Sequence, residues 1–213
     1  MMRTEPHQGQ FEGGAGCVPL YALRYQLALM RRDEREKALV GFYGHLAHGM
    51  TRETFIGGEG CRYVLGADED GRGFYLPPNS TSNAAWLIML RYLLIQDWDL
   101  DEDQVPDTLR LMYGVPRRWL ADGKQIELKN APTAFGIVSM ECRSKLKAGY
   151  VDISLTPPER PAKSMLLRAP LPEGWKVDSV EVDGNKVPVV GGDSVDLSGK
   201  TKPVTVRFNV KAT

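Results

Sequence analysis

The densest group of residues that could take part in chemistry lies between residues 44 and 75, where carboxylates, aromatic rings and glycines alternate. Glu53 and Glu59 stand in a segment that reads TRETFIGGEG. Glutamates can act as general acids or bases, and the glycines around Glu59 let its backbone approach an open cleft. Aromatic faces pack against the apolar faces of sugar rings. Such rings surround both glutamates, at Phe55, Tyr63, Phe74 and Tyr75. Aromatic residues of this kind suit a saccharide cleft.

Each of these residues also has a plain structural explanation. Glu59 fits a solvated turn, Glu53 can cap a neighbouring element, and Phe55 can pack its loop onto the helices. His45 and His48 are three residues apart on an expected helix and share a face, but no third metal ligand stands out. No glycine cluster has the context of a phosphate loop, and no serine or cysteine nucleophile site is recognisable. We therefore expect neither a metal nor another cofactor.

Helices are expected on both sides of this segment. Residues 18–30 are apolar around most of a helical circumference. A second helix is expected to follow at once and to end near Gly49, with Asp33 and Glu36 spaced as a capping box. The two segments predict an antiparallel αα-hairpin.

A third helix is expected from Thr81 or Ser82, whose hydroxyl can cap it, to about Gln96. Its residues 84–90 are apolar on every face, so burying it needs neighbours on every side. Two other helices and one sheet supply only part of that cover. We expect the missing partners to be further helical hairpins of a parent protein, or a second copy of this chain.

The sequence changes character at the acidic segment 97–107, which reads as a linker between a helical part (1–105) and a β part (106–213). Asp122-Gly123 and Asp183-Gly184 indicate hairpin turns, because glycine accepts a positive φ. The expected strands are short and numerous: 109–113, 117–121, 125–129, 135–143, 150–155, 164–168, 176–182, 187–190 and 204–210. The predicted fold class is α+β, with N-terminal helical hairpins followed by an antiparallel β-sandwich.

Composition narrows the possible partners. The 213 residues carry a net charge of +0, so no global basic field attracts nucleic acid or an anionic membrane. The run from Ala84 to Ile95 is too short to span a bilayer, and no signal peptide is recognisable in this chain. The 3 cysteines match no zinc or redox spacing, although one disulfide remains open.

Four motifs taken together resemble a known family. They are LAHGMTRETFIGGE, YLPPNSTSNAAWLIMLRYLL, PRRWLADGKQIELKNAPTAFG and LPEGW. In order and content they resemble the C-terminal end of bacterial six-hairpin glycosidases, especially the rhamnosidase-like branches, over residues 18–210. The resemblance implies an (α/α)6 toroid followed by a β-sandwich. A complete toroid has six helical hairpins, whereas this chain has roughly one and a half.

In that clan a carboxylate typically lies in the loop between the helices of a late hairpin. By this resemblance Glu59 is the first candidate catalytic residue and Glu53 the second, and the mate of either lies in sequence outside this chain. The implied substrate contacts are Phe55, Arg62, Tyr63 and Tyr75. The resemblance implies a glycan-hydrolysing parent, periplasmic or secreted and inverting by default, of which this chain alone is an incomplete catalyst. The alternative is a non-catalytic module that binds carbohydrate or stabilises an assembly.

Overall fold

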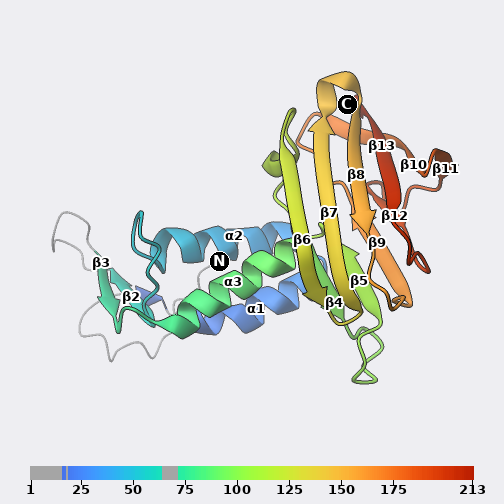
Figure 1. Ribbon diagram of the computed structural model, residues 1–213. Helices are drawn as coiled ribbons and strands as arrows, with labels where there is room; N and C mark the ends of the chain where they lie inside the picture. Colours follow the sequence, from blue (N-terminus) through green and yellow to red (C-terminus); the bar gives the residue numbers. More distant parts are fainter. Residues whose placement is uncertain (1–15, 18, 64–71) are drawn as a thin grey trace. The chain divides into compact units, whose positions relative to one another are not determined.

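The structure is a computed structural model that describes residues 16–17, 19–63 and 72–213. For residues 16–17, 19–22, 61–63 and 72–75 it describes the backbone alone. The chain divides into two compact units between Tyr92 and Leu93. Helices dominate the first unit, and the second contains only strands and short 3-10 turns apart from the last residues of one helix (Figure 1). The predicted α+β class, with N-terminal helices followed by a β-sandwich, is confirmed.

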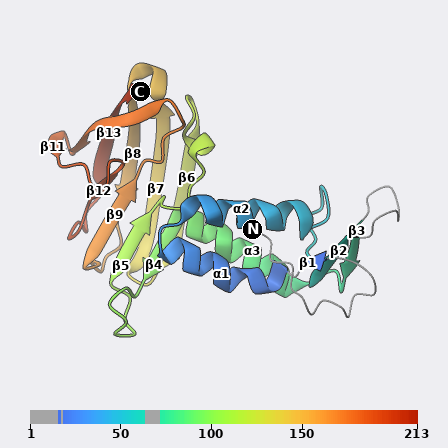
Figure 2. The same ribbon diagram turned by 180° about the vertical axis from the view of Figure 1, so that it is seen from behind.

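Three helices form the first unit: α1 (Pro19–Arg31), α2 (Arg35–His48) and α3 (Ser80–Leu94). Figure 2 shows them running side by side. The hairpin of α1 and α2 crosses closely at Gly41, where an added Cβ would lie 1.7 Å from Nε2 of Gln26. Glycine is therefore what allows α2 to approach the fully buried Gln26.

Two expected helix starts are wrong in detail. Asp33 has a φ of +60° and Glu34 occupies the N-cap of α2, so Asp33 does not hold the N-cap position that the expected capping box gives it. At α3 the cap is Asn79, whose Oδ1 accepts a hydrogen bond of 2.9 Å from the backbone N–H of Ser82. Asparagine is among the best N-cap residues, so α3 begins one residue before the expected Thr81.

The apolar third helix is not covered on every side. Met89 is fully buried and Trp86 stacks on Phe42 of α2, with ring centroids 5.1 Å apart. By contrast, Leu87 and Ile88 remain 58% and 39% exposed. Large apolar side chains are exposed on the other helices too, at Tyr25, Val40 and Tyr43. The first unit thus leaves apolar surface uncovered on all three helices.

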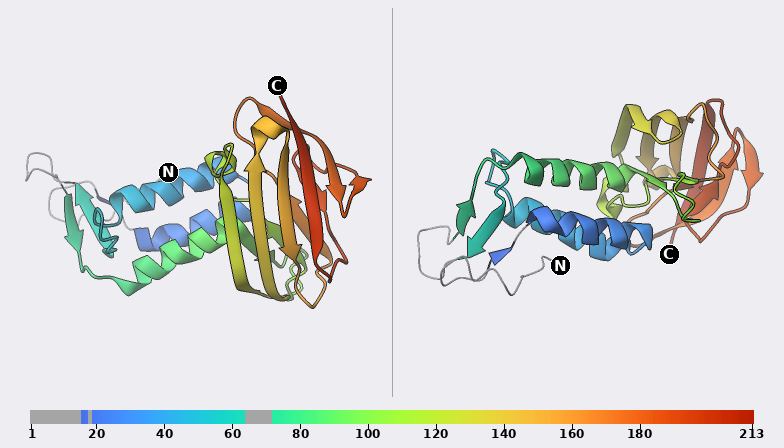
Figure 3. Two further views of the ribbon diagram at one scale, coloured as in Figure 1. Left: turned by 45° about the horizontal axis from the view of Figure 1, so that its top comes forward. Right: turned by 90° about the horizontal axis from the view of Figure 1, so that it is seen from below.

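A small antiparallel sheet, which was not predicted, combines one strand before α1 with two strands between α2 and α3. It consists of β1 (Gly16–Cys17), β2 (Gly60–Tyr63) and β3 (Arg72–Tyr75), in the order β1-β2-β3 (Figure 3). The register sets Cys17 opposite Cys61. Opposite residues in an antiparallel ladder have Cα atoms about 4.5–5.5 Å apart, within the range that a disulfide needs.

Two sheets build the second unit. Their strands are β4 (Ile95–Trp98), β5 (Thr108–Leu111), β6 (Gln125–Thr133), β7 (Gly136–Lys145), β8 (Tyr150–Thr156), β9 (Ser164–Arg168), β10 (Trp175–Val182), β11 (Asn185–Val187), β12 (Ser194–Asp196) and β13 (Val204–Ala212). The six-stranded sheet has the order β11-β10-β13-β8-β7-β6, and the four-stranded sheet the order β12-β9-β5-β4. Every pair is antiparallel except β5 with β9, which corrects the expectation of a purely antiparallel sandwich.

Several local predictions change for identifiable reasons. The expected strand 117–121 is a 3-10 turn, η2 (Arg117–Leu120), so Asp122-Gly123 leads from this turn into β6 instead of joining two strands. A second 3-10 turn, η3 (Leu146–Ala148), precedes β8. The hairpin at Asp183-Gly184 is confirmed, with φ of +51° and +78° between β10 and β11. The acidic segment 97–107 is no linker, because it connects the paired strands β4 and β5.

The core of the second unit fills the space between its sheets. One buried row crosses five strands of the six-stranded sheet through residues that the register places side by side: Ile126, Cys142, Ile153, Val206 and Val182. Leu109, Leu111, Met165 and Leu167 of the four-stranded sheet belong to the same cluster. Burial raises the pKa of the Cys142 thiol to about 12, so this cysteine stays an unreactive core residue. Trp119 and Trp175 are partly buried and pack against this cluster.

Candidate functional site

The two candidate glutamates lie on one loop, residues 49–59, which leads from the end of α2 to β2. Glu53 is exposed with a φ of +66°, and Phe55 is 55% exposed with a φ of +52°. Glu59 is half-buried. A positive φ in a residue other than glycine costs about 1–3 kcal/mol and persists only where the surroundings enforce it. The loop therefore holds a conformation that it would not choose alone.

Part of the enforcement comes from the loop itself. The backbone N–H of Thr51 donates to the carbonyl of Ile56, and the N–H of Ile56 donates back to Thr51 Oγ1, both at 2.9 Å. The hydroxyls of Thr51 and Thr54 lie 2.6 Å apart. An isolated bridge pairs Met50 with Gly57 at the base. These bonds close residues 51–56 into a compact turn that carries Glu53 and Phe55.

The start of α3 supplies the other part, through three residues that we call the α3 clamp: Asn79, Ser82 and Asn83. The Asn83 amide accepts from the N–H of Gly57 at 2.7 Å and donates to the carbonyl of Phe55 at 3.2 Å. The hydroxyl of Ser82 donates to the carbonyl of Gly58 at 2.7 Å. The N–H of Asn79 donates to the carbonyl of Gly57 at 2.7 Å. The TRETFIGGEG and NSTSN segments of the sequence thus form one structure.

The clamp was not predicted as part of the site. The sequence predicts only helix capping for Thr81 or Ser82, and nothing in it pairs residue 83 with residue 57. The available signal was chemical: Asn79, Ser82 and Asn83 are three polar side chains at the start of an otherwise apolar helix. Residues of these types hydrogen-bond to nearby backbone groups more readily than they support a helix interior.

The remaining predicted substrate contacts lie on the neighbouring strands. The register pairs Gly60 with Tyr75, Arg62 with Gly73 and Tyr63 with Arg72. The backbone of Tyr75 is therefore level with the residue that follows Glu59. The side chains of Arg62, Tyr63 and Tyr75 lie outside the described part of the structure, as does residue 71 before β3.

Neither candidate glutamate is neutralised by a described neighbour. Within the residues that the structure describes, no donor or cation contacts the carboxylate of Glu53 or Glu59. A carboxylate that is free of structural bonds remains available to a ligand. The loop thus presents two acidic groups and one exposed ring. Its own hydrogen bonds and the α3 clamp hold its backbone in place.

The two histidines of α2 do not share an environment. His45 is 1% exposed, and neither ring nitrogen has a hydrogen-bond partner among the described residues. Burial lowers the pKa of His45 to about 4, because the charged imidazolium loses its hydration. His48 is exposed at the C-terminal end of the helix, where the helix dipole favours a basic residue.

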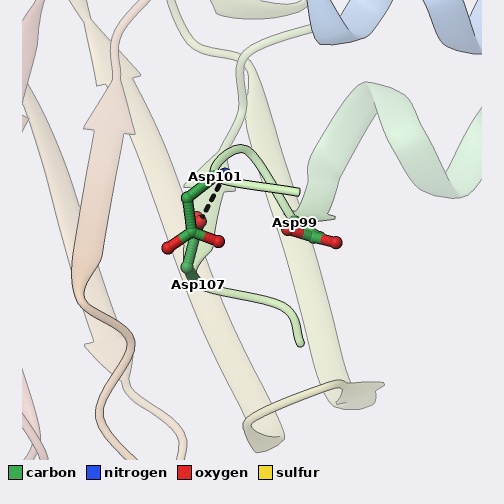
Figure 4. A group of neighbouring side chains, drawn as sticks. All are labelled: Asp99, Asp101 and Asp107. Carbon is green, nitrogen blue, oxygen red and sulfur yellow. Dashed lines mark hydrogen bonds between the residues drawn. The ribbon is translucent and has the colours of Figure 1, made fainter. Parts of the chain in front are cut away.

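A second acidic group forms in the loop between β4 and β5, where one oxygen from each of Asp99, Asp101 and Asp107 lies within 4.8 Å of the others (Figure 4). Asp107 Oδ2 accepts from the backbone N–H groups of Leu100 and Asp101 at 3.1 and 3.0 Å. The ammonium of Lys163 lies 2.7 Å from Asp101, and this hydrogen bond is the main reason that the pKa of Asp101 is lowered. These bonds give the cluster a sufficient role in closing the loop.

The outer face of the six-stranded sheet is polar, and charged side chains on neighbouring strands pair with one another. The register aligns a row of alternating charge through Arg143, Asp152, Arg207, Glu181 and Lys186. Arg207 binds Asp152 through two nitrogens, at 2.7 and 2.8 Å. A shallow trough of about 390 Å³ lies on this face, and short side chains such as Ser154 and Thr205 line it.

Comparisons with known proteins give little further guidance. No family model and no curated protein matches the chain. A search of solved structures finds an uncharacterized protein, lmo2446, from Listeria monocytogenes EGD-e. The similarity has a TM-score of 0.32 at 13% identity and covers 54% of this chain but only 11% of the other. In the described part of the chain, no helix combines the length and the apolar character needed to cross a membrane.

Proposed function

We propose that this chain is the C-terminal part of a six-hairpin glycosidase and that the 49–59 loop belongs to its glycan-binding cleft. In this proposal Glu59 or Glu53 is one of the two carboxylates of the reaction, and its mate comes from outside the chain. Phe55, Arg62, Tyr63 and Tyr75 contact the sugar. Further helical hairpins, or a second copy of the chain, cover the exposed apolar faces of α2 and α3.

The proposed chemistry follows from what a glycosidic bond needs. One carboxyl group protonates the leaving oxygen, while the other activates water or attacks the sugar from the opposite side. Glu59 is half-buried and follows the clamped residues Gly57 and Gly58, so it suits a carboxyl group that must keep a fixed position. Glu53 is exposed and suits contact with a ligand that arrives from solvent.

The conformation of the loop is the observation that carries this proposal. Two residues without the freedom of glycine, Glu53 and Phe55, are held at positive φ by hydrogen bonds from another element. Strain of this kind concentrates at binding and catalytic sites, where a fixed side-chain position outweighs its cost. Asp33 and Asp183 also have a positive φ in short turns, but the 49–59 loop combines two such residues with hydrogen bonds to α3.

A hydrolysis screen on the whole gene product tests the proposal. Nitrophenyl glycosides and reducing-end release from polysaccharides are measured for the wild type and for Glu59→Gln and Glu53→Gln. Glu173→Gln, at an exposed glutamate of the second unit, is the matched control. We expect at least one loop variant to lose activity on the order of a hundredfold or more, whereas the control stays active. Turnover that is unaffected by both loop substitutions would contradict the assignment.

The second candidate function is carbohydrate binding by the sandwich without catalysis, and the trough on the six-stranded sheet favours it. Hydroxyl groups at Ser154 and Thr205 are suited to hydrogen bonds with a neutral sugar, and the charged residues of the lining, Asp152, Glu181 and Arg207, offer no attraction to an anionic ligand. Replacing Ser154 with tyrosine fills the trough, whereas Thr201→Tyr adds the same ring at an exposed site outside it. If the sandwich is the binding site, glycan affinity falls in the first variant alone.

A further inference from the structure

We propose that Asn83 is a positioning residue: its side-chain amide fixes the backbone of residues 55–57 and, through it, the glutamates on both sides. The fixing of the loop stands on the geometry alone. Its value for catalysis rests on the proposed function.

The first argument is that one amide makes two complementary contacts. Oδ1 of Asn83 accepts from the N–H of Gly57, and Nδ2 donates to the carbonyl of Phe55, 28 residues earlier in the chain. An amide group is suited to this role because it offers an acceptor and a donor side by side. Aspartate or leucine at this position would keep one contact or neither.

The second argument comes from Gly57. A Cβ added there would lie 2.3 Å from Oδ1 of Asn83 and 3.1 Å from Cβ of Ser82. The loop backbone therefore lies directly against the start of α3, with room for no side chain between them. Such a close approach makes the position of residue 57 depend on the position of Asn83.

The third argument is that α3 itself does not require Asn83. Asn79 already caps the helix, and the backbone N–H of Asn83 donates to the carbonyl of Asn79 in the ordinary helical pattern. Asparagine is a poor helix former inside the first turns, so its presence at residue 83 needs another reason. The two bonds to the loop supply that reason.

Because the backbone of the loop is strained, the bonds to Asn83 determine where its side chains lie. Glu53 and Phe55 hold a backbone conformation that is disfavoured by about 1–3 kcal/mol each, so a loop that loses its bonds to Asn83 has a reason to relax. Relaxation would move the carboxylate of Glu53 and the ring of Phe55 together. Asn83 would then control both without touching a ligand.

Hydrogen exchange of the Gly57 amide tests the inference without any substrate. Asn83→Leu removes both contacts at similar size, whereas Asn83→Asp keeps the acceptor for Gly57. Ser82→Ala removes only the neighbouring bond to Gly58, and Thr81→Ala alters an exposed residue of the same helical turn as a control. We expect exchange at Gly57 to accelerate on the order of tenfold in Asn83→Leu and to stay near the wild-type rate in Asn83→Asp and Thr81→Ala.

The same variants separate this inference from the proposed function. Circular dichroism verifies that each variant retains its helices. Equal exchange rates in Asn83→Leu and Thr81→Ala would overturn the clamp. If exchange accelerates as expected but Glu53→Gln and Glu59→Gln leave glycan binding and turnover unchanged, the clamp stands and the glycosidase assignment fails. If Glu53→Gln, Glu59→Gln and Asn83→Leu all lose turnover while Asn83→Leu keeps the wild-type KM, Asn83 acts through the position of the reacting groups.

Discussion

His45 is the residue through which pH should act on the helical unit. The unfolded chain takes up a proton on this imidazole near pH 6.5, whereas the folded chain resists protonation until about pH 4. Because the unfolded state binds the extra proton in this window, lowering the pH from 6.5 to 4 favours unfolding, by about 3 kcal/mol in all.

The prediction is that His45→Leu removes most of this pH dependence. Urea unfolding followed by helical circular dichroism, at several pH values between 4 and 7, measures it. His48→Gln is the control, because His48 lies on the same helix and is exposed. Parallel pH profiles for the wild type and His45→Leu would show that carboxylates, and not this histidine, govern acid unfolding.

Gln26 offers a second test at the level of one side chain. Its amide is fully buried at the crossing of α1 and α2, and neither its nitrogen nor its oxygen has a partner among the described residues. A buried polar group without a hydrogen bond costs about 1–3 kcal/mol. Gln26→Met keeps the length of the side chain and should therefore stabilise the unit, by about 1 kcal/mol in urea unfolding. A loss of stability would contradict this prediction.

Among the elements, α3 depends on its first turn. Asn79→Ala removes the cap at Ser82 and should cost about 1 kcal/mol of unfolding free energy. Asn185→Ala, on an exposed hairpin of the sandwich, is a matched control that leaves the helical signal unchanged. Equal effects of the two substitutions on the thermal unfolding of the helices would contradict the assigned cap.

At the scale of elements, the sequence predicts what depends on local pattern. The helical stripes of α1, α2 and α3 and most long strands of the sandwich follow from apolar periodicity, and the turn at Asp183-Gly184 follows from its two residues. The element at residues 117–120 escaped prediction because four residues with mixed apolar character fit a strand and a 3-10 turn equally. The parallel pairing of β5 with β9 joins strands distant in sequence, so no local pattern reveals it.

The residues of the candidate site also divide into those that the sequence predicts and those that only the structure reveals. Glu53, Phe55 and Glu59 were recognisable from their types and their glycine neighbours, and the structure places them on one loop. The clamp was not recognisable, because the bonds from Asn83 and Ser82 reach residues more than twenty positions away. The acidic segment 97–107 reads as a linker in the sequence because it separates the helical apolar pattern from short alternating runs. Its role emerges only from the pairing of β4 with β5.

For the whole molecule, the exposed apolar residues of the helices predict association. Leu87 and Val40 are 58% and 59% exposed, and side chains of this kind gain free energy when a partner covers them. We expect light scattering to show that the chain self-associates with rising concentration and that Leu87→Glu weakens this association. Val190→Glu, at an exposed apolar residue of the sandwich, is the control. A wild-type chain that remains a monomer at high concentration would contradict this prediction.

The most direct test of the central claim is to observe where a glycan binds. Backbone amide resonances of the ¹⁵N-labelled chain are followed while a panel of oligosaccharides is added, with Asn83→Leu as a second sample. The account predicts shifts concentrated at Phe55, Gly57 and Gly58, which weaken when the clamp is removed. Shifts confined to Ser154 and Thr205 on the six-stranded sheet, or no shifts with any oligosaccharide, would contradict it.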